Sequence, residues 1–125
     1  EVYEDALQQI DHWQQEGVSL AVMSSSRNCR SILRAAKLLD RFETIVDGND
    51  LARLGLRGKP APDPFLQAAR QLNVEPWQAL VVEDAISGVA SGRAGNFALV
   101  VGIDRDGVAD ELREAGADRV VRDLR

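Results

Sequence analysis

Residues that crosslink a fold or bind transition metals are scarce in this sequence. It contains one cysteine, Cys29, and one histidine, His12. A single cysteine cannot form an internal disulfide, and without a cysteine–histidine cluster no zinc site is predicted. No apolar run approaches the roughly 20 residues that span a bilayer, and the N-terminus lacks the basic and apolar regions of a signal peptide. We therefore expect a soluble protein of the reducing cytoplasm, with no membrane partner.

Positively charged residues are also fewer than negatively charged ones. The chain carries 15 Lys and Arg residues against 20 Asp and Glu residues, a formal net charge of −5. Because binding to a nucleic-acid backbone requires clustered Lys and Arg, we expect no nucleic-acid partner. The content of 45% hydrophobic and 28% charged residues is typical of a folded globular protein. A length of 125 residues suits one core, so we expect residues 1–125 to form a single domain.

Apolar periodicity predicts helices and strands that alternate along the chain. Apolar residues recur at three- and four-residue steps in residues 3–16, which is typical of an amphipathic helix, and Gly17 is expected to end it. Similar patterns predict helices at residues 28–39, 64–72, 86–94 and 108–115. Short β-rich runs predict strands at residues 18–23, 44–46, 79–82, 97–101 and 119–121. Residues 47–50 are predicted to form a turn, and Asp63 to cap the helix that begins at Pro64.

The alternation of helices with apolar strands predicts an α/β fold, with a doubly wound parallel sheet between two layers of helices. In such sheets ligands bind outside the carboxyl ends of the strands, so the residues that follow each strand are the candidates for chemistry. Five polar residues follow the first predicted strand: Ser24, Ser25, Ser26, Arg27 and Asn28. Lys59 lies in the loop after the second strand, and Glu83 and Asp84 follow the third.

The three serines precede a predicted helix and could bind an anion. Hydroxyl groups and the unpaired amides of a first helical turn both donate hydrogen bonds, and a phosphate would accept them. The alternative is that Ser26 merely caps the helix.

Lys59 and the acidic pair suggest phosphate chemistry with a divalent cation. Prolines beside Lys59 restrict its loop, which favours an ammonium held in place to neutralise phosphate oxygens. Glu83 and Asp84 offer the hard oxygen ligands that Mg²⁺ prefers. The alternatives are a solvated, idle lysine, an Asp84 that caps the next helix, and a Glu83 that faces solvent.

Serines, then a lysine before proline, then an acidic pair, each at a strand end, resemble the second, third and fourth motifs of the haloacid dehalogenase superfamily. The segments VMSSSRN, LRGKPAPDPFLQAA and LVVEDAISGVASGRAGNFALVVGIDR are similar to the β-phosphoglucomutase-like subfamily. That subfamily includes bacterial hydrolases found beside or fused to disaccharide phosphorylases, so such an enzyme is a candidate partner. The resemblance covers nearly the whole chain.

The resemblance implies roles for the strand-end residues. Ser24 would bind the transferring phosphoryl group, and the four residues after it would line the phosphate side. Lys59 would stabilise the phosphoryl charge and bridge to the nucleophile, while Glu83 and Asp84 would hold Mg²⁺. The implied reaction is that of a phosphatase or phosphomutase, through an aspartyl-phosphate, on a small phosphorylated metabolite, with a sugar phosphate favoured.

One part of the family pattern is not found in the sequence. In these relatives the nucleophile and the acid/base come from an Asp-x-Asp motif after the first strand, followed by a helical cap domain, and neither precedes Glu1. We therefore expect the first strand and the cap to be lacking, the strands carrying Met23 and Val82 to lose their shared neighbour, and the chain to be inactive alone.

Two alternatives bear on that missing motif. The run Asp104-Arg105-Asp106-Gly107 matches Asp-x-Asp-Gly, but in the relatives this stretch closes the fifth strand, and we interpret it as a turn. The other alternative is that the chain is a non-catalytic remnant or interaction module that kept the fold.

Overall fold

The structure is a computed structural model that describes residues 4–124. Its helices are α1 (Glu4–Gln15), α2 (Cys29–Ala35), α3 (Gly48–Leu54), α4 (Asp63–Gln71), α5 (Ile86–Ala94) and α6 (Ala109–Ala115), with 3₁₀ turns η1 (Leu39–Arg41) and η2 (Pro76–Gln78). Its strands are β1 (Ala21–Met23), β2 (Thr44–Val46), β3 (Leu80–Glu83), β4 (Leu99–Ile103) and β5 (Arg119–Val121). Tyr3, where the first helix was predicted to begin, lies outside the described residues. Within them, no helix has the length and apolar character of a membrane span.

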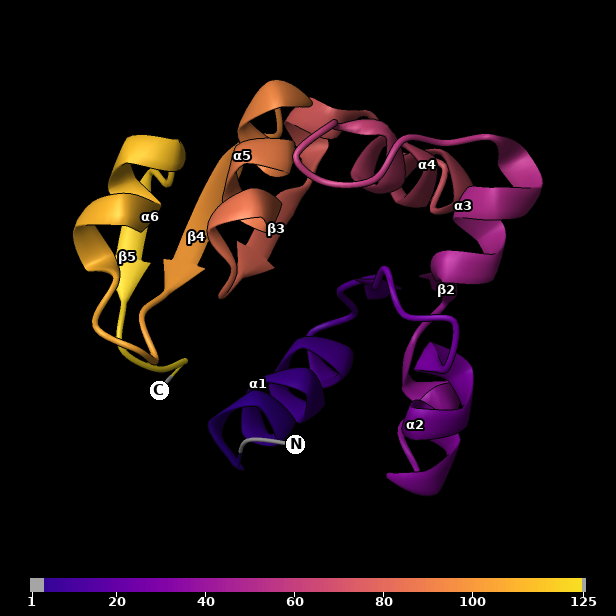
Figure 1. Ribbon diagram of the computed structural model, residues 1–125. Coiled ribbons are helices and arrows are strands. Elements are labelled where there is room, and N and C mark those ends of the chain that lie inside the picture. The colour runs from indigo at the N-terminus through magenta and orange to yellow at the C-terminus, as the bar shows by residue number, and fades with distance from the viewer. Residues whose placement is uncertain (1–3, 125) are drawn as a thin grey trace.

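All strand pairs are parallel, which confirms the predicted α/β architecture. β1 pairs with β2, with Val22 opposite Ile45, and β4 pairs with β3 on one side and β5 on the other. Figure 1 shows β3, β4 and β5 side by side with α5 and α6 against them, while β2 and α2 lie apart from this group. Within the described residues, β1 and β3 therefore belong to separate sheets, as predicted for the strands carrying Met23 and Val82.

The best-buried core lies in the three-stranded half of the molecule. Val81 of β3, Val100 of β4, Val89 of α5 and Leu112 of α6 pack together and are at most 4% exposed. Close packing of β-branched side chains against a helix is the usual source of stability in such a sheet. A Cβ at Gly92 would lie 3.2 Å from the Val100 side chain, so glycine lets α5 approach the sheet closely.

A cavity of ≈ 650 Å³ separates the two sheets. Its lining is mostly apolar and comes from β1, β3, α1 and α4, with Val22 and Val82 contributed by the two strands and Phe65 by α4. The facing edges of β1 and β3 are both strand edges, and an exposed edge carries backbone groups able to pair with a further strand.

Contacts between the two ends of the chain join α1 to the three-stranded half. Both Asp5 oxygens accept hydrogen bonds from Arg105 Nη2, at 3.2 and 2.9 Å, and Asp5 Oδ2 also accepts from the Leu124 amide at 2.8 Å. Gln9 Nε2 donates to the Leu124 carbonyl at 2.7 Å. Asp5 is buried, and the Arg105 guanidinium, followed by the Leu124 amide, holds the pKa of its carboxyl below the usual range.

The predicted turn at residues 47–50 is wrong, because these residues begin helix α3. Asp47 is the N-cap: its side chain accepts from the Asp50 amide at 3.0 Å, and the Asp50 carboxylate accepts from the Asp47 amide at 3.0 Å. This reciprocal pair satisfies amides that have no partner inside the helix. Asp47-Gly48-Asn49-Asp50 has a turn-like composition, but the spacing of its two aspartates is that of a helix start.

Two other boundaries also differ from the prediction. The second helix ends at Ala35 rather than at residue 39, because Lys37 takes a positive φ of 61° and η1 follows. Pro62, not Asp63, is the N-cap of α4. The Asp63 carboxylate instead pairs with Arg57 at 2.9 Å, and that guanidinium lowers the pKa of Asp63.

Candidate active site

Residues 24–28, here called the serine loop, connect β1 to α2. The Ser24 amide donates to the Val46 carbonyl at 2.9 Å, which fixes the start of the loop to β2. The Ser26 amide then donates to Ser24 Oγ at 3.1 Å, and the Asn28 amide donates to Ser26 Oγ at 3.0 Å. A hydroxyl that accepts from an amide still has its own O–H to donate, so Ser26 keeps a donor for a ligand, whereas the Ser24 hydroxyl also bonds to Cys29. Asn28, without a side-chain bond, is the N-cap of α2, so the alternative in which Ser26 caps the helix is wrong.

An ion cluster missed at the sequence level lies beside the serine loop. Arg30 of α2 contacts the Asp47 carboxylate, and it donates to Asp50 Oδ2 and to the Ile45 carbonyl at 3.2 Å each. Asp47 is 1% exposed and Asp50 is 8% exposed. Burial on its own raises the pKa of Asp50, but the Asp47 amide, Arg53 and Arg30 outweigh it and lower this pKa to about 2. The Asp-x-x-Asp spacing could have revealed the cap, although not its partner Arg30.

The buried thiol of Cys29 lies at the start of α2, next to the serine loop. Burial raises its pKa, against a smaller lowering by its hydrogen bond with the Ser24 hydroxyl. Cys29 therefore acts as a small packing residue.

Lys59 and Glu83 form a partly buried ion pair. Lys59 Nζ lies 3.2 Å from Glu83 Oε2, and the two side chains are 16% and 12% exposed. Glu83 Oε1 also accepts from the Ala85 amide at 3.2 Å. The alternatives in which Lys59 is solvated and Glu83 faces solvent are therefore wrong. Ser91 Oγ of α5 donates to the Ala61 carbonyl at 2.6 Å, which ties the loop that carries Lys59 to α5.

Gly88 provides the space in which the Glu83 carboxylate lies. A Cβ at this position would stand 2.2 Å from Glu83 Cδ and 2.4 Å from Oε2, far inside contact distance. Glu83 thus folds back over the first turn of α5, where only a residue without a side chain leaves room. Sequence reasoning missed this role, because the contact joins a strand end to a helix surface.

The acidic pair at the end of β3 fits the ligand chemistry of Mg²⁺. Asp84 is exposed, and Ala85 occupies the N-cap of α5 with no side-chain bond, so the alternative in which Asp84 caps that helix is wrong. Among residues 4–124 no three His, Cys, Asp or Glu side chains gather as a metal-binding group. Mg²⁺ commonly takes one or two carboxylates and completes its shell with water and phosphate, which two adjacent acidic residues can satisfy.

The Asp-x-Asp-Gly run after β4 has structural contacts. Asp104 Oδ1 accepts from the Val108 amide at 2.7 Å, immediately before α6, and Arg105 pairs with Asp5. Asp106 and Gly107 are exposed. These contacts support the interpretation of the run as a turn.

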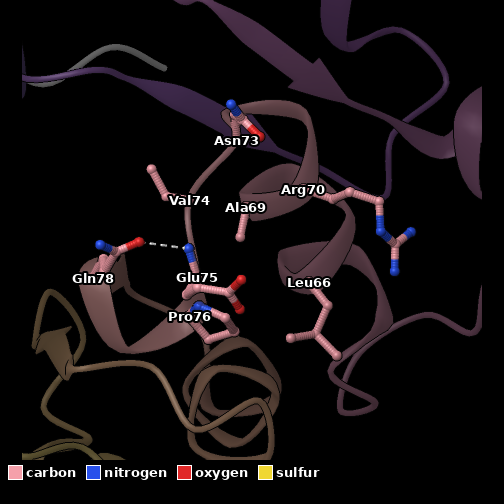
Figure 2. Close-up of a pocket in the computed structure, with 8 residues that line it drawn as sticks. All are labelled: Leu66, Ala69, Arg70, Asn73, Val74, Glu75, Pro76 and Gln78. Atoms are coloured by element: carbon pink, nitrogen blue, oxygen red, sulfur yellow. Dashed lines mark hydrogen bonds between the residues drawn. The ribbon is translucent and has the colours of Figure 1, made fainter.

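A separate hollow of ≈ 390 Å³ lies between the end of α4 and η2 (Figure 2). Its lining residues are Leu66, Ala69, Arg70, Asn73, Val74, Glu75, Pro76 and Gln78. The Glu75 amide donates to Gln78 Oε1 at 2.9 Å across its rim. The lining contains none of the candidate residues at the strand ends, among which the contact between Lys59 and Glu83 is the one that joins two separate segments.

Residues 1–96 match the family model of the haloacid dehalogenase-like hydrolases. The chain belongs to this family. A β-phosphoglucomutase of Mycobacterium bovis is 56% identical over 112 residues, which make up 86% of this chain and 42% of that protein. This identity confirms the predicted relation to the β-phosphoglucomutase-like subfamily of the haloacid dehalogenase superfamily.

Two further members of the superfamily extend the comparison. A trehalose-phosphate phosphatase of Mycobacterium leprae is 36% identical over 112 residues, or 86% of this chain and 24% of that protein. The crystal structure of a hydrolase of this family from Deinococcus radiodurans, with bound phosphate and sodium, gives a TM-score of 0.80 at 34% identity, covering 95% of this chain and 54% of that one. The chain thus spans about half or less of each of these relatives.

Proposed function

We propose that the intact protein is a Mg²⁺-dependent phosphatase or phosphomutase that acts on a small phosphorylated metabolite, with a sugar phosphate favoured. The observation that carries this proposal is the pair formed by Lys59 and Glu83 beside Asp84, at the carboxyl end of β3. A partly buried ammonium next to two carboxylates suits a phosphate that arrives with a divalent cation. The names of the phosphomutase and phosphatase relatives support the same substrate class.

The proposed chemistry needs an aspartate from sequence that precedes Glu1. Its carboxylate would form a bond to phosphorus while the ester P–O bond breaks, and the leaving oxygen would take a proton from a second acidic group. Lys59 would offset charge on the phosphoryl oxygens, and the Ser24 hydroxyl would donate to one of them. Bound Mg²⁺, held by Asp84 and Glu83, would supply further positive charge at the phosphate. Water or a sugar hydroxyl would then take the phosphoryl group from the aspartate.

The cavity between the two sheets supports the proposed position of that aspartate. Because β1 and β3 present unpaired edges to an apolar space, a parallel strand placed between them would hydrogen-bond to both and join the sheets. Such a strand would end at the same rim as β1 and β3, next to the serine loop and Glu83. Residues 1–125 alone are then expected to be inactive.

The test is a phosphatase and mutase assay of the intact gene product on sugar phosphates, with Mg²⁺ or with a chelator. We expect Mg²⁺-dependent turnover, and a loss of about 100-fold or more in kcat for Lys59→Met. Gln8→Ala, an exposed change in α1, is the control. Absence of turnover, together with an upstream reading frame that encodes no Asp-x-Asp motif, would favour a non-catalytic remnant instead.

A further inference from the structure

The first turn of α3 packs against the backbone of the serine loop. The Gly48 amide donates to the Ser26 carbonyl at 3.0 Å, and Asn49 Nδ2 donates to the Arg27 carbonyl at 3.1 Å. The preceding carbonyl, that of Ser25, lies so close to Gly48 that an added Cβ would stand 2.4 Å from its oxygen. Three successive carbonyl groups of the loop therefore face α3.

This orientation has a consequence for the donors of the loop. In each planar trans peptide the carbonyl oxygen and the following N–H point in opposite directions, so the amides of residues 26–28 point away from α3. Two of them bind the hydroxyl oxygens of Ser24 and Ser26, which places these hydroxyls on the side away from α3. A carbonyl oxygen repels an anion, whereas hydroxyl and amide donors attract it. Contact with α3 thus leaves the donor side of the loop to a ligand.

The start of α3 is itself held in place. Asp47 and Asp50 each accept a hydrogen bond from the amide of the other across the first turn of the helix, and Arg30 of α2 contacts both carboxylates. Since α2 begins where the serine loop ends, the loop is fixed at its β1 end by Val46, along its length by α3, and at its far end by Arg30.

We propose that Gly48 and Asn49 are positioning residues that keep the carbonyls of the serine loop turned away from the phosphate-binding side. The identity of the ligand rests on the proposed function, whereas the shape of the loop does not. Gly48 acts through its amide and its lack of a side chain, and Asn49 through its carboxamide. Neither residue is required to touch the substrate.

The test compares Gly48→Ala and Asn49→Ala in the intact gene product. Gly58→Ala is the matched glycine control because a Cβ there meets nothing within 4 Å, and Gln8→Ala is the control for a polar surface change. Three quantities are measured for each variant and control: hydrogen exchange of the amides in residues 24–28, the inhibition constant of orthophosphate, and the free energy of unfolding in urea. We expect faster exchange in the loop and an inhibition constant raised about tenfold for Gly48→Ala, with a smaller rise for Asn49→Ala.

The outcomes separate this inference from the proposed function. Unchanged loop exchange in both variants overturns it, and so does faster exchange with an unchanged inhibition constant. A fall in unfolding free energy without either loop effect would assign α3 a purely structural role. If Gly48→Ala does not fold, Asn49→Ala still decides, because alanine is well tolerated in a helix. If orthophosphate fails to inhibit the unmodified protein, the proposed function fails, while exchange still reports whether α3 holds the loop.

Discussion

Replacing Gly88 with alanine should displace Glu83 and release Lys59. The new Cβ would stand 2.2 Å from Glu83 Cγ and Cδ, and the side chain can escape only by rotating away from α5. Rotation breaks the contact with Lys59 Nζ and the bond from the Ala85 amide, both at 3.2 Å. The ammonium would then lose the partner that holds it in place.

The expected change in stability combines two opposing effects. Alanine is favoured over glycine inside a helix by roughly 0.5–1 kcal/mol, so the substitution by itself stabilises α5. A hydrogen bond to a charged group contributes about 1.5–3 kcal/mol, and two such bonds are lost, although the displaced carboxylate regains water. We therefore expect a net destabilisation of about 2–5 kcal/mol.

A double-mutant cycle makes the reasoning testable. In a Glu83→Ala background the clashing side chain is gone, so Gly88→Ala should stabilise the protein by about 0.5–1 kcal/mol, with the opposite sign. Urea denaturation of the four proteins measures the free energies of unfolding. If Gly88→Ala destabilises both backgrounds equally, the close contact with Glu83 does not govern this position and the reasoning is refuted.

Three further predictions concern single carboxylates. The folded pKa of Asp50, about 2, is below its ordinary 3.8, so the contribution of this carboxylate to stability is complete above about pH 4 and is lost as pH falls through 2. Asp50→Asn should therefore remove about 2 kcal/mol of the acid dependence of the unfolding free energy, which urea denaturation at several pH values measures. Asp84→Asn should raise the Mg²⁺ concentration needed for half-maximal activity about tenfold or more, and an unchanged titration would exclude Asp84 as a ligand. Asp106→Asn should leave kcat within about twofold, since Asp106 is exposed in a turn, whereas loss of activity would restore residues 104–107 as a candidate Asp-x-Asp motif.

Much of the fold could be predicted because it depends on local patterns. The apolar runs that became β3 and β4 are short and rich in valine, and each is followed by a helix, an alternation that indicates a parallel sheet. Helix α3 was missed because its seven residues contain too few turns to establish a period, and its stability depends on Asp47, Asp50 and a distant arginine. Asp63 was misplaced by one position, because its carboxylate pairs with Arg57 instead of capping α4.

The candidate site shows the same division between local and distant causes. Ser24, Lys59 and Glu83 could be recognised because parallel strands place their carboxyl ends at one rim of the sheet. This placement does not depend on the conformation of the loops. The contact between Lys59 and Glu83 joins residues 24 positions apart, and it confirms only that these two lie together. Convergence of the serine loop with them stays a prediction. The parts played by Gly48 and Gly88 could not be predicted, since each depends on which atom of another element occupies the space beside it.

The hydrogen bond between the Leu124 amide and Asp5 brings residues 119 positions apart in sequence to within 2.8 Å of each other. Helix α1 and the segment that follows β5 therefore lie against each other, although the sequence separates them by nearly the whole described chain. Helix α1 therefore cannot move away from the three-stranded half without breaking the hydrogen bonds that Asp5 accepts from Arg105 and from the Leu124 amide.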